Sequence, residues 1–195
     1  MERLILARHA ESELNVRELL NGDPSVAAGL TARGREQARV LGRETGPVDV
    51  VAHTSFARTR ETAELAWPRV PRVVLPELDE ISFGRFEGTR WGDGYFEWAR
   101  TSSPLEDCPG GGESRAAAIA RYVRGYRRLL ERPEETVAAV VHGAHVRYVL
   151  LALEGTPPVA TLDAVPPAVP FVVVRAAFER AVEVIDAWTR EPAWR

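Results

Sequence analysis

Charged and imidazole side chains follow four short apolar runs that have the length and composition of buried strands. Arg8 and His9 come after the first run, and His142 and Gly143 come after the fourth. The second run leads into segment 53–58, which holds a histidine and an arginine, and the third leads into an acidic segment. Ligands of open α/β sheets bind at the carboxyl ends of the strands, so we expect these groups to meet in one site.

This combination of side chains suits a phosphoryl group. The guanidinium groups of Arg8 and Arg58 can hold a tetrahedral dianion through paired hydrogen bonds. His142 and Gly143 open an expected helix, whose free N–H groups and dipole favour an anion. A neutral imidazole at His9 can attack phosphorus, and neighbouring cations disfavour its protonated form.

The leaving alkoxide of such a reaction needs a proton, and Glu77, Asp79 and Glu80 follow the third apolar run. The acid must be protonated when substrate is bound, and a substrate dianion nearby raises a carboxyl pKa in that direction. Each feature alone has an ordinary structural explanation, such as a surface pair or an acidic loop. Their joint occurrence at expected strand ends is what favours a function.

These residues can meet only if the apolar runs form neighbouring strands. The expected strands are 3–7, 48–52, 72–75 and 136–141, with a closing pair at 171–176 and 181–187 that can form a hairpin. The expected helices are 33–44, 58–67, 113–132 and 144–153, with Thr31 as the N-cap of the first. Strands that alternate with helices predict an α/β fold: three layers, α/β/α, with a mostly parallel central sheet.

The 195 residues suit a single domain, 1–195, because the chain shows neither an internal repeat nor a linker long enough to divide it. Segment 83–98 differs from the rest, since it holds six of the 15 aromatic residues among four glycines. We expect a lid-like excursion over about 81–112. Its rings can contact a ring-shaped leaving group, or they can simply pack the lid onto the sheet.

Composition narrows the chemistry and the partners. All 25 basic residues are arginine, which excludes Schiff-base chemistry and a Walker-type lysine. The formal net charge is −3, and acidic and basic residues are mixed along the chain without the basic stripe that nucleic-acid binding needs. We therefore expect a small-molecule partner and no nucleic acid.

Cys108 is the only cysteine, which excludes an intramolecular disulfide and a cysteine-based zinc cluster. The start of the chain has too few apolar residues for a secretory signal, and the longest apolar runs fall far below the ~20 residues that span a bilayer. We expect a cytoplasmic protein without membrane contact. His142 and His145 can share a helix face, but no third ligand and no HExxH motif accompany them, so we expect neither metal nor cofactor.

Six ordered blocks between residue 3 and about residue 150 resemble the motifs of the histidine phosphatase superfamily, the phosphoglycerate mutase-like fold. The blocks are RHAES at 8–12 with Asn15, LTxxGxxQA from Leu30, TSFAR with ETA at 54–63, LDE with FG and EG at 78–88, PGGGES at 109–114, and VHG with Arg147 at 141–147. The Pro-rich tail matches nothing specific.

The resemblance implies roles for the matched residues. His9 is expected to become phosphohistidine. The expected phosphoryl-binding groups are Arg8, Arg58, His142 and Gly143, with Asn15 at the pocket edge. Glu80, chosen over Glu77 by alignment, is expected to protonate the leaving group and then to activate water, with Glu77 as the reserve candidate.

Three departures from the family pattern stand out. Ala10 replaces the usual glycine after the histidine and places a methyl group close to the nucleophile's backbone. Thr54 and Ser55 stand where Ser-Pro is usual and are still expected to cap the following helix. Phe83 replaces the tyrosine of the mutases, so that hydroxyl is missing.

We expect a metal-independent phosphomonoesterase, because a mutase needs extra basic residues on its lid and this lid offers only scattered arginines at 85, 90 and 100. Mutase-type phosphoryl transfer is the alternative within enzymes. A phosphate-ligand binding module that has lost turnover is the alternative outside them, and Ala10 is its one support. Sugar phosphates, nucleotide-derived phosphates and cofactor precursors such as α-ribazole phosphate stay open as substrates, and a homodimer is compatible with the fold.

Overall fold

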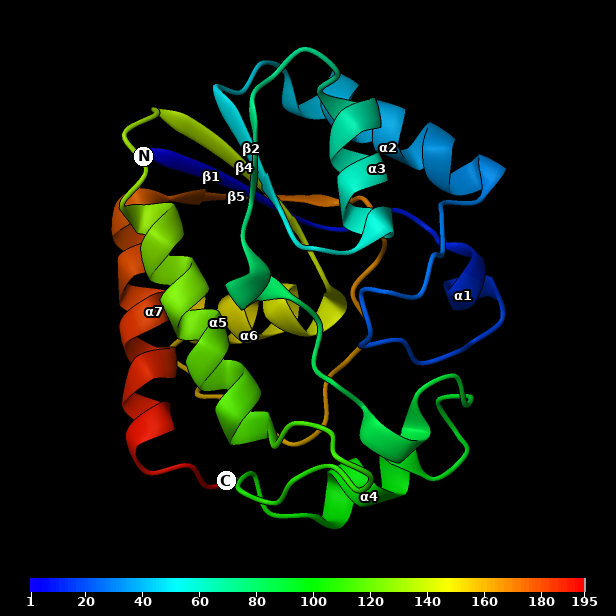
Figure 1. Ribbon diagram of the computed structural model, residues 1–195. Helices are drawn as coiled ribbons and strands as arrows, with labels where there is room; N and C mark the ends of the chain where they lie inside the picture. The colour runs from blue at the N-terminus through cyan, green and yellow to red at the C-terminus, as the bar shows by residue number, and fades with distance from the viewer. Residues whose placement is uncertain (195) are drawn as a thin grey trace.

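Five strands form one central sheet in the order β3-β2-β4-β1-β5. The computed structural model describes residues 1–194 (Figure 1). The strands are β1 (Arg3–Arg8), β2 (Val50–His53), β3 (Arg72–Val74), β4 (Thr136–Val141) and β5 (Pro170–Val174). The first four run parallel to one another, and β5 pairs antiparallel with β1 at one edge.

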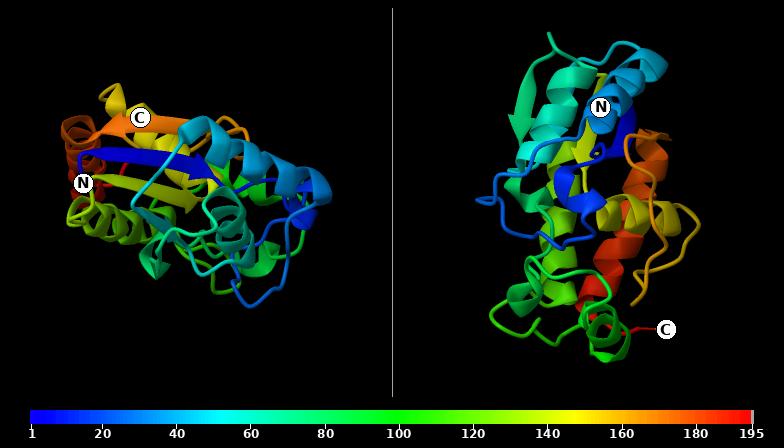
Figure 2. Two further views of the ribbon diagram at one scale, coloured as in Figure 1. Left: turned by 90° about the horizontal axis from the view of Figure 1, so that it is seen from above. Right: turned by 90° about the vertical axis from the view of Figure 1, so that its right-hand side faces the viewer.

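Helices cover both faces of this sheet (Figures 1 and 2). One layer consists of α2 (Ala32–Thr45) and α3 (Ala57–Ala66), and the other of α5 (Arg115–Leu130), α6 (Gly143–Leu153) and α7 (Arg175–Arg190). Short helices lie in the loops: α1 (Glu13–Val16), α4 (Tyr95–Thr101) and the 3₁₀ turns η1 (Pro76–Leu78) and η2 (Gly84–Phe86). The expected three-layer α/β fold with a mostly parallel sheet is confirmed.

The strands carry apolar side chains on both faces, which explains their continuous apolar runs. In β1, Leu4 and Leu6 join the core formed with α5, α6 and α7, while Ile5 and Ala7 join the core formed with α2 and α3. All four are at most 1% exposed. Polar side chains are therefore confined to the two ends of β1, with Arg3 at its start and Arg8 at its end, directly before His9.

The expected strand at 181–187 is wrong, because these residues belong to helix α7. The buried residues of this helix are Phe178, Ala181, Val182, Ile185 and Trp188. Their spacing of three and four is helical, whereas alternation between apolar and polar residues holds over a few positions only. Strand β5 ends at Val174, where α7 begins at once, so no hairpin forms.

The two expected helix starts near the site have different outcomes. Thr31 caps α2 as expected, since its hydroxyl accepts a hydrogen bond from the Gly34 N–H at 2.9 Å. The expected cap of α3 by Thr54 or Ser55 is wrong, because Phe56 takes the N-cap position without a side-chain hydrogen bond. The Thr54 hydroxyl instead lies 3.0 Å from Nε2 of His142.

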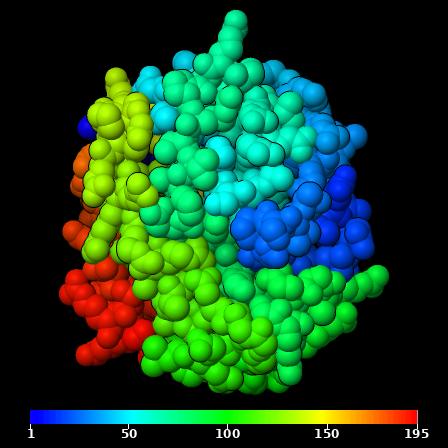
Figure 3. Space-filling model, viewed as in Figure 1, coloured from blue at the N-terminus to red at the C-terminus, as the bar shows by residue number. Residues whose placement is uncertain are grey.

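The segment expected as a lid, 81–112, holds η2 and α4 and packs beside the loop that follows β1. Leu20 donates to the Thr89 carbonyl and accepts from the Gly88 N–H, both at 3.0 Å. In Figure 3 the blue residues of the first loop and the green residues of the lid lie side by side on one face. Among the described residues, no helix has the length and apolar character needed to cross a membrane.

Gly34 fixes how closely the start of α2 approaches the chain just after His9. A Cβ at this position would lie 2.0 Å from the Glu11 carbonyl oxygen. We expect Gly34→Ala to lower the free energy of unfolding by about 1–3 kcal/mol in chemical denaturation, because the backbone must shift. Gly92→Ala is the matched control, since a Cβ there meets nothing within 4 Å. Equal stability of the two variants would contradict the packing argument.

Candidate active site

His9 lies directly after β1, and its side chain is buried at 3% exposure. Nδ1 lies 2.8 Å from the Ala10 carbonyl oxygen, so Nδ1 carries the proton and donates it there. Nε2 is then left as an acceptor, and it receives the Nε–H of Arg58 at 3.1 Å. Burial, together with Arg58 and Arg8, holds the pKa of His9 well below its usual value. His9 is therefore a neutral imidazole whose unprotonated Nε2 accepts a hydrogen bond from Arg58.

Arg58 stands in the first turn of α3 and connects the parts of the site. Its Nη1 donates to Oδ1 of Asn21 at 2.5 Å, and its Nη2 donates to the Asn21 carbonyl oxygen at 3.0 Å. Nη2 also lies 3.2 Å from Nδ1 of His142. Burial lowers the pKa of Arg58 to about 10, which leaves it a cation at neutral pH.

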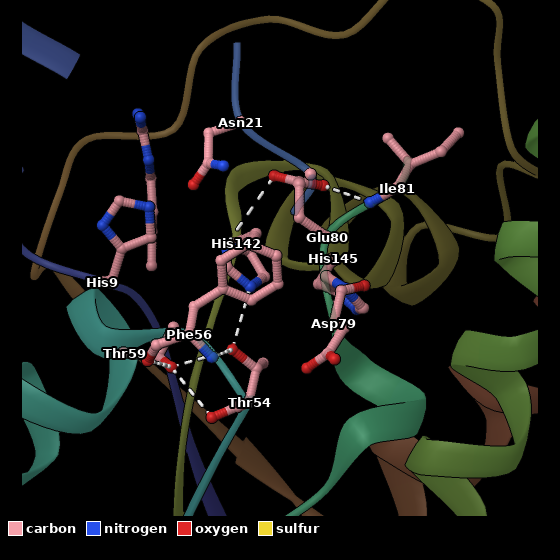
Figure 4. Close-up of polar contacts among 12 residues, drawn as sticks. His9, Asn21, Thr54, Phe56, Thr59, Asp79, Glu80, Ile81, His142 and His145 are labelled. Carbon is pink, nitrogen blue, oxygen red and sulfur yellow. Dashed lines mark hydrogen bonds and ion pairs between the residues drawn. The ribbon is translucent and has the colours of Figure 1, made fainter. Parts of the chain in front are cut away.

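His142 is the N-cap residue of α6, immediately after β4 (Figure 4). Its Nδ1 faces Arg58, so the proton sits on Nε2 and points to the Thr54 hydroxyl. That hydroxyl lies 2.8 Å from the Thr59 hydroxyl, which donates in turn to the Phe56 carbonyl oxygen at 2.8 Å. Burial, with Arg58 beside it, keeps the pKa of His142 well below its usual value.

Of the acids that follow the third apolar run, Glu80 is the one that lines the cavity at His9. Its Oε2 lies 3.8 Å from Nδ1 of His142, and its Oε1 accepts the Ile81 N–H at 3.1 Å (Figure 4). Burial raises the pKa of Glu80 above its ordinary value, against the opposing effect of Arg58. Glu77 instead forms an ion pair with Arg128 on α5 and does not line the cavity.

Arg121 of α5 holds the backbone of the segment that ends in Glu80. Its Nη1 donates to the carbonyl oxygens of Glu77 and Asp79 at 3.1 and 2.8 Å, and its Nη2 reaches the Glu80 carbonyl oxygen at 3.3 Å. Glu113 fixes the same guanidinium through contacts of 3.0 Å to Nε and 2.6 Å to Nη2. The Glu80 carboxyl group therefore projects from a backbone segment that Arg121 holds at three carbonyl oxygens.

Arg8, Gly143 and Asn15 line a cavity of about 450 Å³ in front of His9. Arg8 donates through Nη1 to the Val165 carbonyl oxygen at 2.7 Å, and its buried Nε has no partner among residues 1–194. Gly143 is the first residue of α6, at the helix end where backbone N–H groups are free. Oδ1 of Asn15 accepts the Ser12 N–H at 3.2 Å within a capping box.

The structure thus brings together most of the residues expected from sequence. The cavity is lined by Arg8, His9, Asn15, Arg58, Glu80 and Gly143. His142 is fully buried behind Arg58 and does not line the cavity itself. Within residues 1–194, no three His, Cys, Asp or Glu side chains group as metal ligands.

Sequence reasoning missed three supports of the site: Asn21, Arg121 and the tail segment 160–165. The tail closes the cavity and supplies the Val165 carbonyl oxygen to Arg8. Asn21 precedes Gly22 in a polar loop, which predicts a turn rather than a partner for Arg58. Arg121 is one of several arginines on an expected helix, and no pattern in the sequence singles it out.

Residues 4–190 match the sequence model of the histidine phosphatase superfamily (branch 1). A 2,3-bisphosphoglycerate-dependent phosphoglycerate mutase from Methylobacterium sp. (strain 4-46) is 31% identical, covering 80% of this chain and 82% of the relative. The chain therefore belongs to the histidine phosphatase superfamily, as its motifs indicate.

Two solved structures illustrate the range of similar folds. The protein TTHB049 from Thermus thermophilus shares 34% identity at a TM-score of 0.68, with coverage of 88% of this chain and 92% of that one. An alpha-ribazole phosphatase from Shigella flexneri shares 29% identity at a TM-score of 0.68, with coverage of 80% and 81%. Members of the superfamily are catalytic, and both phosphatases and mutases occur among its members similar to this chain.

His145, a buried histidine beside the site, makes the stability of the fold depend on pH. It is fully buried, its Nδ1 lies 3.2 Å from the Tyr126 hydroxyl, and its Nε2 lies 3.5 Å from the Asp79 carbonyl oxygen. Burial, with Arg121 nearby, lowers the pKa of His145 from 6.5 to about 3. Between about pH 6.5 and about pH 3, His145 is protonated in the unfolded chain but not in the folded chain. This residue therefore lowers the stability of the fold as pH falls through that range.

We expect His145→Gln to flatten this dependence, because glutamine keeps a donor and an acceptor but does not titrate. The slope of the free energy of unfolding against pH should be smaller in the variant than in the wild type, by up to about 1.4 kcal/mol per pH unit. Urea denaturation between pH 7 and pH 4.5 measures the difference. Parallel pH profiles for the two proteins would show that His145 is not held neutral.

Proposed function

We propose that this protein hydrolyses phosphate monoesters through a phosphohistidine at His9. The observation that carries the proposal is the pairing of a neutral His9, whose Nε2 is an acceptor, with a buried Glu80 of raised pKa at one end of a cavity. Phosphoryl transfer from a phosphate ester requires a nucleophilic nitrogen that carries no proton. It also requires an acid that still carries the proton needed by the leaving alcohol.

Donors around His9 suit the phosphoryl oxygens. Arg58 already points its Nε–H at the nucleophilic nitrogen, where the phosphoryl group must arrive. Arg8 is a cation that lines the cavity, and Gly143 opens α6 with its positive dipole end. His142 presents Nδ1 toward Arg58 and so acts as its support unless the ring is protonated.

The reaction follows in two steps whose atoms balance. Nε2 of His9 bonds to phosphorus, the bond from phosphorus to the ester oxygen breaks, and that oxygen takes the Glu80 proton and departs as the alcohol. The Glu80 carboxylate then takes a proton from water, whose oxygen bonds to phosphorus while the P–N bond breaks. His9 regains its lone pair, Glu80 regains its proton, and phosphate leaves.

The charges lining the cavity favour water as acceptor over a phosphorylated sugar acid. The cationic residues that line the cavity are Arg8, Arg58 and the buried Arg115. Glu18 and Asp163 are acidic residues of the same lining. The guanidinium of Arg115 is already bonded to carbonyl oxygens at the end of α4. Mutase-type transfer stays the second candidate because relatives named as phosphoglycerate mutases are similar to this chain.

An activity panel tests the proposal directly. Purified protein with EDTA should release phosphate from at least one phosphomonoester, and His9→Ala should abolish this release. A pulse of ³²P-labelled substrate followed by acid-free denaturation should leave label on His9 in the wild type only. Conversion of 3-phosphoglycerate to its isomer in preference to phosphate release would favour the mutase, and ligand binding without any turnover would favour a binding module.

Glu80→Gln should separate the two steps. With p-nitrophenyl phosphate, whose leaving group is a stable anion, the variant should release about one equivalent of nitrophenol per active site in a burst and then turn over slowly. The second step still needs a base, so steady turnover should fall about 10²–10⁴-fold. Stopped-flow absorbance measures both phases. Glu77→Gln is the matched control and should behave like the wild type, whereas a loss of turnover there would contradict the assignment.

The dependence of kcat/KM on pH should reflect the ionisation of His9 and Glu80. Activity requires an unprotonated His9 and a protonated Glu80, so kcat/KM should fall as pH rises through the raised pKa of Glu80. It should fall again only at acidity well below the usual pKa of histidine, because the pKa of His9 is lowered. An alkaline limb that survives in Glu80→Gln would rule out Glu80 as the acid.

A further inference from the structure

A chain of two hydroxyl groups starts at Nε2 of His142, the ring nitrogen that does not face Arg58 (Figure 4). The Thr54 hydroxyl lies 3.0 Å from this nitrogen and 2.8 Å from the Thr59 hydroxyl. The Thr59 hydroxyl lies 2.8 Å from the carbonyl oxygen of Phe56, where the chain ends. We call Thr54 and Thr59 the hydroxyl pair.

The direction of the hydrogen bonds is fixed at both ends of this chain. The Thr59 hydroxyl contacts the carbonyl oxygens of Phe56 at 2.8 Å and Thr54 at 3.3 Å, and a carbonyl oxygen can only accept. Thr59 therefore gives its one proton to a carbonyl, and its oxygen accepts the proton of Thr54. Thr54 has then no proton left for His142 and accepts from Nε2. Arg58 can only donate, so Nδ1 of the same ring accepts from its Nη2. Both ends thus place the proton of neutral His142 on Nε2.

The hydroxyl pair is closed off from solvent and from the cavity. Thr54, Thr59 and His142 are each 0% exposed, and none of them lines the cavity. Within residues 1–194, Nε2 of His142 has no hydrogen-bond partner besides the Thr54 hydroxyl. The partner of one ring nitrogen decides which tautomer a buried histidine takes. Loss of either hydroxyl therefore leaves a buried polar group unpaired or reverses the direction of the chain.

The tautomer of His142 matters because Arg58 contacts both histidines of the site. Its Nε–H reaches Nε2 of His9 at 3.1 Å, and its Nη2 reaches Nδ1 of His142 at 3.2 Å. With the proton on Nδ1, two donors would face each other at that distance, and the guanidinium would have to turn. Because this group is planar and rigid, a turn at Nη2 also moves the Nε–H away from His9. Oε2 of Glu80, 3.8 Å from Nδ1, lies beyond hydrogen-bonding distance and does not compete for that nitrogen.

We propose that Thr54 and Thr59 are positioning residues, which act on the reaction by fixing the tautomer of His142. The fixed tautomer keeps the Nε–H of Arg58 directed at Nε2 of His9, where the phosphoryl group must arrive. This inference rests on the proposed phosphomonoesterase function. Neither threonine lines the cavity, so the hydroxyl pair affects the hydrolysis of every ester by one common factor.

Nuclear magnetic resonance of the ligand-free protein reads the tautomer directly. The chain has four histidines, so long-range ¹H–¹⁵N correlation spectra of histidine-labelled protein resolve each ring, and His9→Gln and His142→Gln assign two of them. In the wild type, His142 should carry its proton on Nε2 and His9 on Nδ1, which makes His9 an internal reference. Thr59→Val should shift His142 toward the Nδ1–H tautomer, because the Thr54 hydroxyl loses its acceptor and donates to Nε2 instead.

Kinetics test the effect on the reaction. Thr54→Val and Thr59→Val should lower kcat/KM about tenfold, the effect of one lost hydrogen bond, and equally for p-nitrophenyl phosphate and ethyl phosphate. Thr54→Ser keeps the hydroxyl and should recover most of the activity lost in Thr54→Val. Thr45→Val is the matched control, since its hydroxyl donates to the Leu41 carbonyl oxygen at 2.8 Å within α2. It should change neither the His142 tautomer nor kcat/KM.

The outcomes are distinguishable. An unchanged His142 tautomer in Thr59→Val, or a changed tautomer with kcat/KM within about twofold of the wild type, would overturn the inference while hydrolysis through His9 stands. Thr59→Val decides the matter by itself if Thr54→Val does not fold. Failure of the wild type to hydrolyse any ester, together with absence of label on His9, would overturn the proposed function and the inference with it. A shifted tautomer with a common loss of kcat/KM, recovered in Thr54→Ser, supports both.

Discussion

The buried guanidinium of Arg58 is the constraint on which the site depends. It is 5% exposed, and its donors reach His9, Asn21 and His142, which come from three different segments of the chain. A cation buried without such partners would cost several kcal/mol, so these segments must converge on it for the fold to be stable. Lysine offers no planar array of donors and cannot substitute.

The same burial has opposite effects on the pKa values of His9 and Glu80, which both line the cavity. Removal from water disfavours any charged form, which lowers the pKa of His9 and raises the pKa of Glu80. Both groups are therefore pushed toward neutrality by a single environment. Arg58 reinforces the effect on His9 and opposes it on Glu80, so the position of one cation tunes the interval between the two pKa values.

Sequence reasoning predicted the parts of this arrangement that depend on where strands end. His9, Glu80 and His142 were found because apolar runs end beside them, and the choice of Glu80 over Glu77 came from the family motif. It could not predict Asn21 or the Val165 carbonyl, because their contacts depend on the path of loops with no periodic pattern. The error at α7 has the same physical origin: a short alternation satisfied a strand pattern, while the wider helical spacing that buries Ile185 and Trp188 was decisive.

The C-terminal segment adds one more consequence. Trp194 stacks on Trp188 with ring centroids 5.1 Å apart, faces the Arg115 guanidinium from one side, and donates from Nε1 to the Ser102 carbonyl oxygen at 3.1 Å. Trp98 of α4 contacts the same guanidinium. Two of the five tryptophans thus meet at the Arg115 guanidinium, between α4 and α5, so any change in the packing of α4 changes the polarity around them. The protein carries its own optical reporter of this packing, readable by intrinsic fluorescence without a label.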